Sequence, residues 1–117
     1  MMKAKLLVLF VALLMVGCGE SPKLRTEYYD NGQKKWEGMF MDGVQDGLMT
    51  SWYESGQKRG ELNFFSGKVM SAKAWKPNGE KCPVTNVKDG NGVLLGYNED
   101  GTEKARYTYK DGELVED

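Results

Sequence analysis

The sequence contains no histidine and only two cysteines, Cys18 and Cys82. Without histidine, a Ser-His-Asp triad, a Cys-His pair and a histidine-based zinc site are all excluded. Cys82 therefore lacks the usual base of a catalytic thiol, and we interpret it as a small, partly buried side chain or a free thiol. No catalytic constellation remains, so the sequence predicts a protein that is not an enzyme and that binds no cofactor or metal.

A strong charge of either sign is also missing. Lysine and arginine number 16 and aspartate and glutamate 17, and the basic residues form no patch. This balance excludes the electrostatic footprint of a nucleic-acid-binding protein. Proline occurs only three times, which argues against a proline-rich linker. After residue 17 no sustained 3.6-residue periodicity appears, so we expect almost no helix there.

The one long apolar run lies at the N-terminus. Lys3 and Lys5 precede an apolar segment from Leu6 to Val16, and the small Gly17 follows it. This run is shorter than the roughly 20 apolar residues that a membrane-spanning helix needs. A basic start, a short apolar core and a small residue are typical of a secretory signal peptide, so we predict one over residues 1–17, in helical form, rather than an anchor helix.

Residues Leu14 to Cys18 resemble a bacterial lipobox, in which the cysteine is lipidated and becomes the first residue of the mature protein. The resemblance implies lipidation of Cys18, a short tether over residues 18–23 and a folded domain over residues 24–117. Several acyl chains, palmitate among them, would hold the protein stably on a membrane. The implied location is the cell envelope, and Gly19 resembles a signal for the periplasmic face of the outer membrane in a host with two membranes.

A repeat runs through the remaining chain. Its anchors are glycines spaced 24, 23 and 22 residues apart, each preceded four residues earlier by an aromatic residue and followed 11 residues later by a second turn glycine. The anchors are Gly32, Gly56, Gly79 and Gly101, and the aromatic residues are Tyr28, Trp52, Trp75 and Tyr97. Such a period indicates a repeat array, here of about four copies.

Each copy reads as a β-hairpin. Its second run alternates, as in Trp36, Gly38 and Phe40, which predicts a strand with one apolar and one polar face. We expect a three-residue loop from Asp30 to Gly32, with positive φ at all four anchor glycines. This loop would pair Thr26 with Trp36 and place Tyr28, Trp52 and Trp75 on the same inner face as Trp36. The fold class is therefore all-β, an elongated antiparallel β-meander of hairpin repeats.

The third copy departs from the pattern. Its second run contains Pro83, which cannot donate a ladder hydrogen bond, so we expect this strand to be bent or to lie at an edge. The charged tail from Leu114 to Asp117 is expected to disfavour pairing of the last edge strand with another chain.

Two groups of side chains are candidates for binding. Tyr29 and Tyr53 are expected on the face opposite the inner aromatic residues, where an exposed strip would contact a partner protein, a peptide or a glycan; plain cross-strand packing is the simpler alternative. Asp42 and Asp46 flank a turn, but a calcium loop needs more ligands than these two carboxylates provide. Aspartate before glycine is ordinary turn chemistry, so we assign no metal here.

With these residues in view, the chain resembles the MORN repeat class in its bacterial variant form. The residues from Tyr28 to Gly47 match that pattern best, and the later copies match it less well. The resemblance implies a structural repeat that serves as a scaffold or adaptor, and related sequences are often labelled antitoxin-like. We therefore expect a non-enzymatic, lipid-anchored module that binds another envelope protein. The alternative is an antitoxin or immunity protein that inhibits a toxin.

Overall fold

The glycine turns divide residues 21–115, the part of the chain that the structure describes, into eight strands without a helix. The structure is a computed structural model. The predicted signal peptide, the predicted lipidation at Cys18 and the last two residues of the predicted charged tail lie outside the described residues. The strands are β1 (Lys23–Tyr28), β2 (Lys34–Met41), β3 (Val44–Trp52), β4 (Lys58–Phe65), β5 (Lys68–Ala74), β6 (Gly92–Tyr97), β7 (Glu103–Lys110) and β8 (Glu113–Val115).

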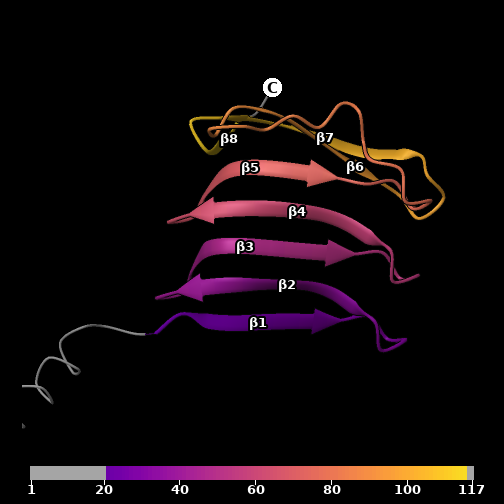
Figure 1. Cartoon of the computed structure of the whole chain (residues 1–117), viewed down its shortest axis with the longest axis horizontal. Helices are drawn as coiled ribbons and strands as arrows, with labels where there is room; N and C mark the ends of the chain where they lie inside the picture. The colour runs from indigo at the N-terminus through magenta and orange to yellow at the C-terminus, as the bar shows by residue number, and fades with distance from the viewer. Residues whose placement is uncertain (1–20, 116–117) are drawn as a thin grey trace, which may run out of the picture.

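The strands form two antiparallel sheets in chain order, one of β1 to β5 and one of β6 to β8 (Figure 1). The first sheet is a stack in which each strand pairs with its neighbour in the chain, and β1 ends the stack away from the second sheet. The all-β meander of hairpins is therefore confirmed, but it consists of two sheets rather than one continuous array.

The first turn of each copy has the predicted geometry. In the first hairpin, Gly32 donates its N–H to the Tyr29 carbonyl at 3.0 Å, and Tyr29 donates to the Gln33 carbonyl at 2.8 Å. These two bonds enclose a three-residue loop, and φ is positive at all four anchor glycines. The second turns differ: both central residues have positive φ, as at Asp42 and Gly43, which defines two-residue type I′ turns.

The predicted strand register is wrong by one residue. Tyr28 pairs with Lys34, but Glu27 pairs with Trp36, because a β-bulge leaves Lys35 without a partner of its own. Thr26 consequently pairs with Glu37 and donates a hydrogen bond to its carboxylate at 3.1 Å. The same shift occurs at Arg59 in the second hairpin and at Lys104 in the fourth.

Because side chains alternate along a strand, this extra residue places each side chain of the first strand on the sheet face opposite to the predicted one. Tyr28, Trp52 and Trp75 therefore do not share a face with Trp36, as the sequence predicted. The register defines a covered face, made of Arg25, Glu27, Trp36, Gly38, Phe40, Met49, Ser51, Gly60, Leu62, Phe64, Ala72 and Ala74. It also defines an open face, made of Leu24, Thr26, Tyr28, Lys34, Glu37, Met39, Val44, Leu48, Thr50, Trp52, Lys58, Glu61, Asn63, Phe65, Ser71 and Lys73.

The array breaks in the third copy, as Pro83 predicted. Residues from Cys82 to Val87 form no regular strand, and an isolated bridge between Trp75 and Lys81 is what remains of the hairpin ladder. Lacking a regular strand there, the first sheet ends at β5 and the chain is free to turn over onto the covered face.

The core lies where the second sheet packs against that face. One cluster joins Tyr53 and Ala74 to Cys82, Leu95 and Tyr97. A second cluster joins Val69, Ala72 and Val87, and Leu62, Phe64, Leu94 and Tyr109 pack against it. Both clusters involve β5 and the second sheet, so the half of the covered face formed by β1 and β2 adds no buried apolar side chain to the core.

Candidate binding surface

The expectation that Tyr53 is exposed is wrong, because only 1% of its surface is accessible. The bulge at Arg59 places it on the covered face, where it packs in the core with Ala74 and Tyr97. Tyr29, the equivalent residue of the first copy, is half-buried. These two residues therefore form no exposed aromatic strip, and Tyr53 has no surface with which to contact a partner.

The two tyrosines instead connect neighbouring copies. Tyr29 donates its hydroxyl hydrogen to the Trp52 carbonyl at 2.7 Å, and Tyr53 donates to the Trp75 carbonyl at 2.6 Å. Lys35 lies 5.7 Å from the centre of the Tyr29 ring, and Arg59 lies 5.4 Å from that of Tyr53. Each bulge residue thus places a cation against the tyrosine of its own hairpin, an attractive arrangement for a ring quadrupole.

The exposed apolar side chains of the first sheet all lie on the open face. The large ones, with their exposed fractions, are Leu24 (60%), Tyr28 (58%), Val44 (45%), Leu48 (47%) and Phe65 (66%). The two core clusters of the described residues join the opposite face to the second sheet and include no residue of the open face. Exposed apolar surface gathered on one side is typical of a surface that binds another molecule.

The part of the open face nearest the three-residue turns is occupied by its own side chains. Lys34 lies 5.7 Å from the centre of the Trp52 ring, and Lys58 lies 5.3 Å from that of Trp75. Both lysines also bond a glutamate at 2.9 Å, namely Glu37 and Glu61. Because lysines cover the tryptophan rings, this part of the face is not a bare aromatic platform for a sugar ring.

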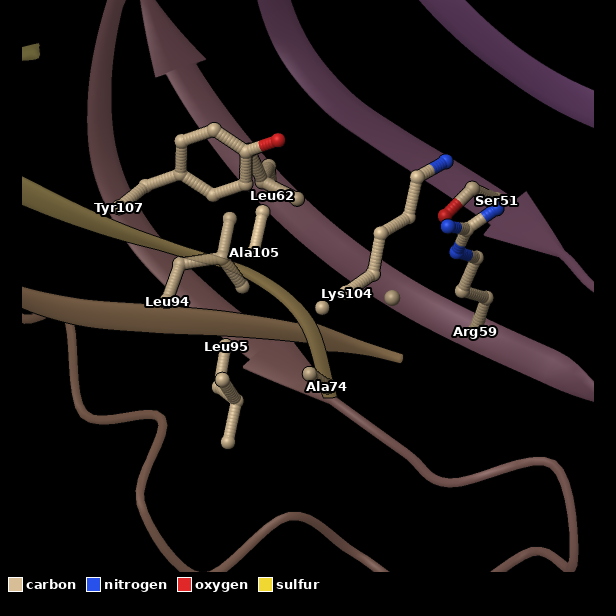
Figure 2. Close-up of a pocket in the computed structure, with 11 residues that line it drawn as sticks. Ser51, Arg59, Leu62, Ala74, Leu94, Leu95, Lys104, Ala105 and Tyr107 are labelled. Atoms are coloured by element: carbon tan, nitrogen blue, oxygen red, sulfur yellow. The ribbon is translucent and has the colours of Figure 1, made fainter. Parts of the chain in front are cut away.

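A small cavity lies where the two sheets meet, with a volume of about 150 Å³. Figure 2 shows Lys104, Arg59 and Ser51 at one end of it and Tyr107, Leu62 and Leu94 at the other. Arg59 donates to the Tyr97 carbonyl at 3.4 Å, and within the described residues neither Arg59 nor Lys104 forms an ion pair. The volume is below the roughly 300 Å³ of ordinary ligand pockets, so this hollow has room for a side chain and not for a cofactor.

Cys82 is a buried free thiol with 2% exposure. Its sulfur accepts hydrogen bonds from the Tyr97 hydroxyl at 3.1 Å and the Thr85 hydroxyl at 3.3 Å. Burial alone raises the pKa of this thiol, but these bonds and those from the backbone of Val84 and Thr85 bring the pKa below its ordinary value. The thiol is therefore a packed and hydrogen-bonded part of the core.

The two aspartates at the first type I′ turn contribute to turn structure. Asp46 accepts a hydrogen bond from the Ser66 amide at 3.1 Å and so links the first type I′ turn to the second. Asp42 occupies the turn itself with φ of 52°. Among the described residues no group of three side chains that could hold a metal ion occurs.

None of residues 21–115 belongs to a helix with the length and apolar character needed to cross a bilayer. Comparison with known proteins adds no relative: no protein-family model, curated protein or solved structure matches this chain. The class that the fold defines is a hairpin-repeat β-protein with one sheet face partly covered and the other open.

Proposed function

We propose that this chain is a non-enzymatic module that binds another protein at the bacterial cell envelope, and that the open face is its contact surface. The observation that carries this proposal is the placement of all five exposed large apolar residues of the first sheet on that one face. Each Å² of apolar surface that is buried contributes about 25 cal/mol of favourable free energy. A partner that covers these side chains therefore gains several kcal/mol, from which the cost of ordering the two proteins is subtracted.

The test captures the partner and maps the contact. Full-length protein is crosslinked in its host cells, and captured proteins are identified by mass spectrometry. We expect Leu48→Glu and Phe65→Glu to abolish capture, because each places a charge in the middle of apolar contact. Lys73→Glu, a charge change on the same face beside polar neighbours, is the matched control and retains it. A partner captured equally by all variants contradicts the assignment of the face.

The captured partner also separates the two roles that the sequence suggests. Capture of an envelope protein supports the adaptor role if variants that no longer bind it leave the cells healthy. A toxin encoded beside this chain, with cell death on deletion of the chain, supports the antitoxin reading. Catalytic turnover that co-purifies with the chain would contradict both.

The proposed anchor is tested at Cys18. We expect Cys18→Ser to move the protein from the membrane fraction to the soluble fraction, because the thioether to the lipid cannot form. A wild-type chain and a Cys82→Ser chain are the controls, and both stay with the membrane. If Cys18→Ser remains membrane-bound, the lipid anchor is wrong.

A further inference from the structure

Strand β1 is the edge strand of the first sheet, at the end of the stack away from the second sheet (Figure 1). Tyr29 directs its N–H toward β2, where it bonds the Gln33 carbonyl. Alternation along β1 then directs the backbone of Glu27 and Arg25 toward β2 and the backbone of Leu24, Thr26 and Tyr28 outward. No described strand pairs with that outer side, so β1 is an edge that can accept another strand.

We propose that β1 pairs antiparallel with β1 of a second copy of this chain, about a twofold axis that passes through Thr26. In this arrangement Thr26 of one chain faces Thr26 of the other, and Leu24 of each chain faces Tyr28 of the other. These are the residues whose backbone groups point outward, so each facing pair exchanges two hydrogen bonds. The two five-stranded sheets join into one.

Charge complementarity selects this register. Centring the axis on Thr26 places Arg25 of each copy opposite Glu27 of the other, which forms two ion pairs on the covered face. A register centred on Arg25 would oppose like charges at the axis. Charged residues on an edge strand ordinarily discourage pairing with other chains, but here the sequence from Leu24 to Tyr28 is complementary to itself.

Apolar complementarity points to the same occupant. Leu24 and Tyr28 are exposed by 60% and 58%, and the register packs them against each other twice on the open face. Lys34 covers Trp52 and Lys58 covers Trp75, whereas no lysine among residues 21–115 lies over the ring of Tyr28, the first aromatic residue of this series. Leu24 of the second copy fills that place. Pro22, which has no N–H, ends the ladder.

A charge exchange tests the pairing. Sedimentation velocity on the full-length protein in mild detergent measures dimer formation as a function of concentration. Arg25→Glu opposes two pairs of glutamates and Glu27→Arg opposes two pairs of arginines, so we expect each to raise the dimer dissociation constant on the order of tenfold. The double variant restores opposite charges across the axis and recovers most of the wild-type affinity.

Recovery of dimer affinity in the double variant distinguishes lost pairing between copies from damage to the fold of each copy. Arg25 also lies over the Phe40 ring at 4.5 Å, and Glu27 accepts a bond from the Trp36 indole at 2.9 Å, so both single changes also weaken contacts inside the chain. The double variant loses those inner contacts too, and only the contact between copies is rebuilt. A double variant no better than the single variants, or a wild-type chain that stays monomeric at every concentration, overturns the proposal.

Disulfide trapping provides an independent measurement. Thr26→Cys places two thiols opposite each other at the axis, within the reach of a disulfide, and mild oxidation should give a covalent dimer. Thr50→Cys is the matched control because Thr50 is the equivalent threonine of the next copy and lies inside the sheet on β3. The buried Cys82 stays reduced in both. Equal crosslinking of the two variants would overturn the proposed axis.

Discussion

At the scale of single residues, one hydroxyl group shows how one copy of the repeat is held to the next. Tyr53 is buried and donates to the Trp75 carbonyl at 2.6 Å. We expect Tyr53→Phe to lower the free energy of unfolding by about 1 kcal/mol, because the part-buried Trp75 carbonyl loses its donor. Tyr29→Phe removes the equivalent bond at a half-buried position and should cost less. Urea unfolding of both variants measures the difference, and equal costs would show that burial does not matter here.

Tyr97 makes stability depend on alkaline pH. Burial, followed by its hydrogen bond to Cys82, raises the pKa of Tyr97 to about 12, above the ordinary tyrosine value of 10.0. Between these values the unfolded chain loses the phenolic proton while the folded chain keeps it, so the free energy of unfolding falls as pH rises from about 10 to about 12. Below pH 10 this contribution is fully present.

The check compares wild type with Tyr97→Phe. Phenolate absorbance of the folded protein should show one tyrosine titrating near pH 12 that the variant lacks, and the variant's stability should fall less steeply over the same range. A difference titration centred near pH 10 would contradict the buried hydrogen bond.

At the scale of the element, the hairpin shows which features the sequence could predict. The three-residue turn follows from local chemistry, because a left-handed position favours glycine, and Gly32 was predicted correctly. The bulges at Lys35 and Arg59 carry no glycine to mark them, and each puts a cation beside a tyrosine ring that is close only in the folded hairpin. Counting alternation through them therefore predicts the wrong face for Tyr28 and Tyr53. One signal was present: Lys35, Arg59 and Lys104 each stand three residues after an anchor glycine.

The type I′ turns of the last two copies stack on each other and hold the second sheet to the first. Gly112 donates to the Gly90 carbonyl at 2.9 Å, and Gly90 donates to the Met70 carbonyl at 2.8 Å. A Cβ on Gly90 would lie 2.7 Å from the Gly112 nitrogen, whereas one on Gly32 would meet nothing within 4 Å.

Alanine substitution at these two glycines separates backbone strain from crowding. Both have φ near +90°, so Gly32→Ala should cost about 1–2 kcal/mol through the left-handed backbone alone. Gly90→Ala should cost about 1–3 kcal/mol more, because the stacked turns must move apart. The midpoints of chemical unfolding measure both changes. Equal losses of unfolding free energy in the two variants would mean that the stacked turns can move apart at no cost.

At the scale of the whole molecule, stability is concentrated at one end. All the buried apolar side chains of the described residues lie between Tyr53 and Tyr97, and β1 and β2 supply none. We therefore expect backbone amides of β1 and β2 to exchange with solvent first, and those of β4, β5 and β6 last, in hydrogen-exchange mass spectrometry. Uniform exchange along the chain would contradict this gradient.

The same gradient explains why the edge strand is the place where a second copy matters most. In a single copy, the outward amides of Leu24, Thr26 and Tyr28 have no acceptor in the first sheet and should exchange quickly, while those of Arg25 and Glu27 are held by β2. Pairing of two β1 strands gives the outward amides acceptors, so their protection should rise with protein concentration. Residue-resolved exchange by NMR checks this, and Arg25→Glu, which weakens pairing, should remove the concentration dependence. Protection that is independent of concentration would mean that the least stable end of the sheet stays unpaired.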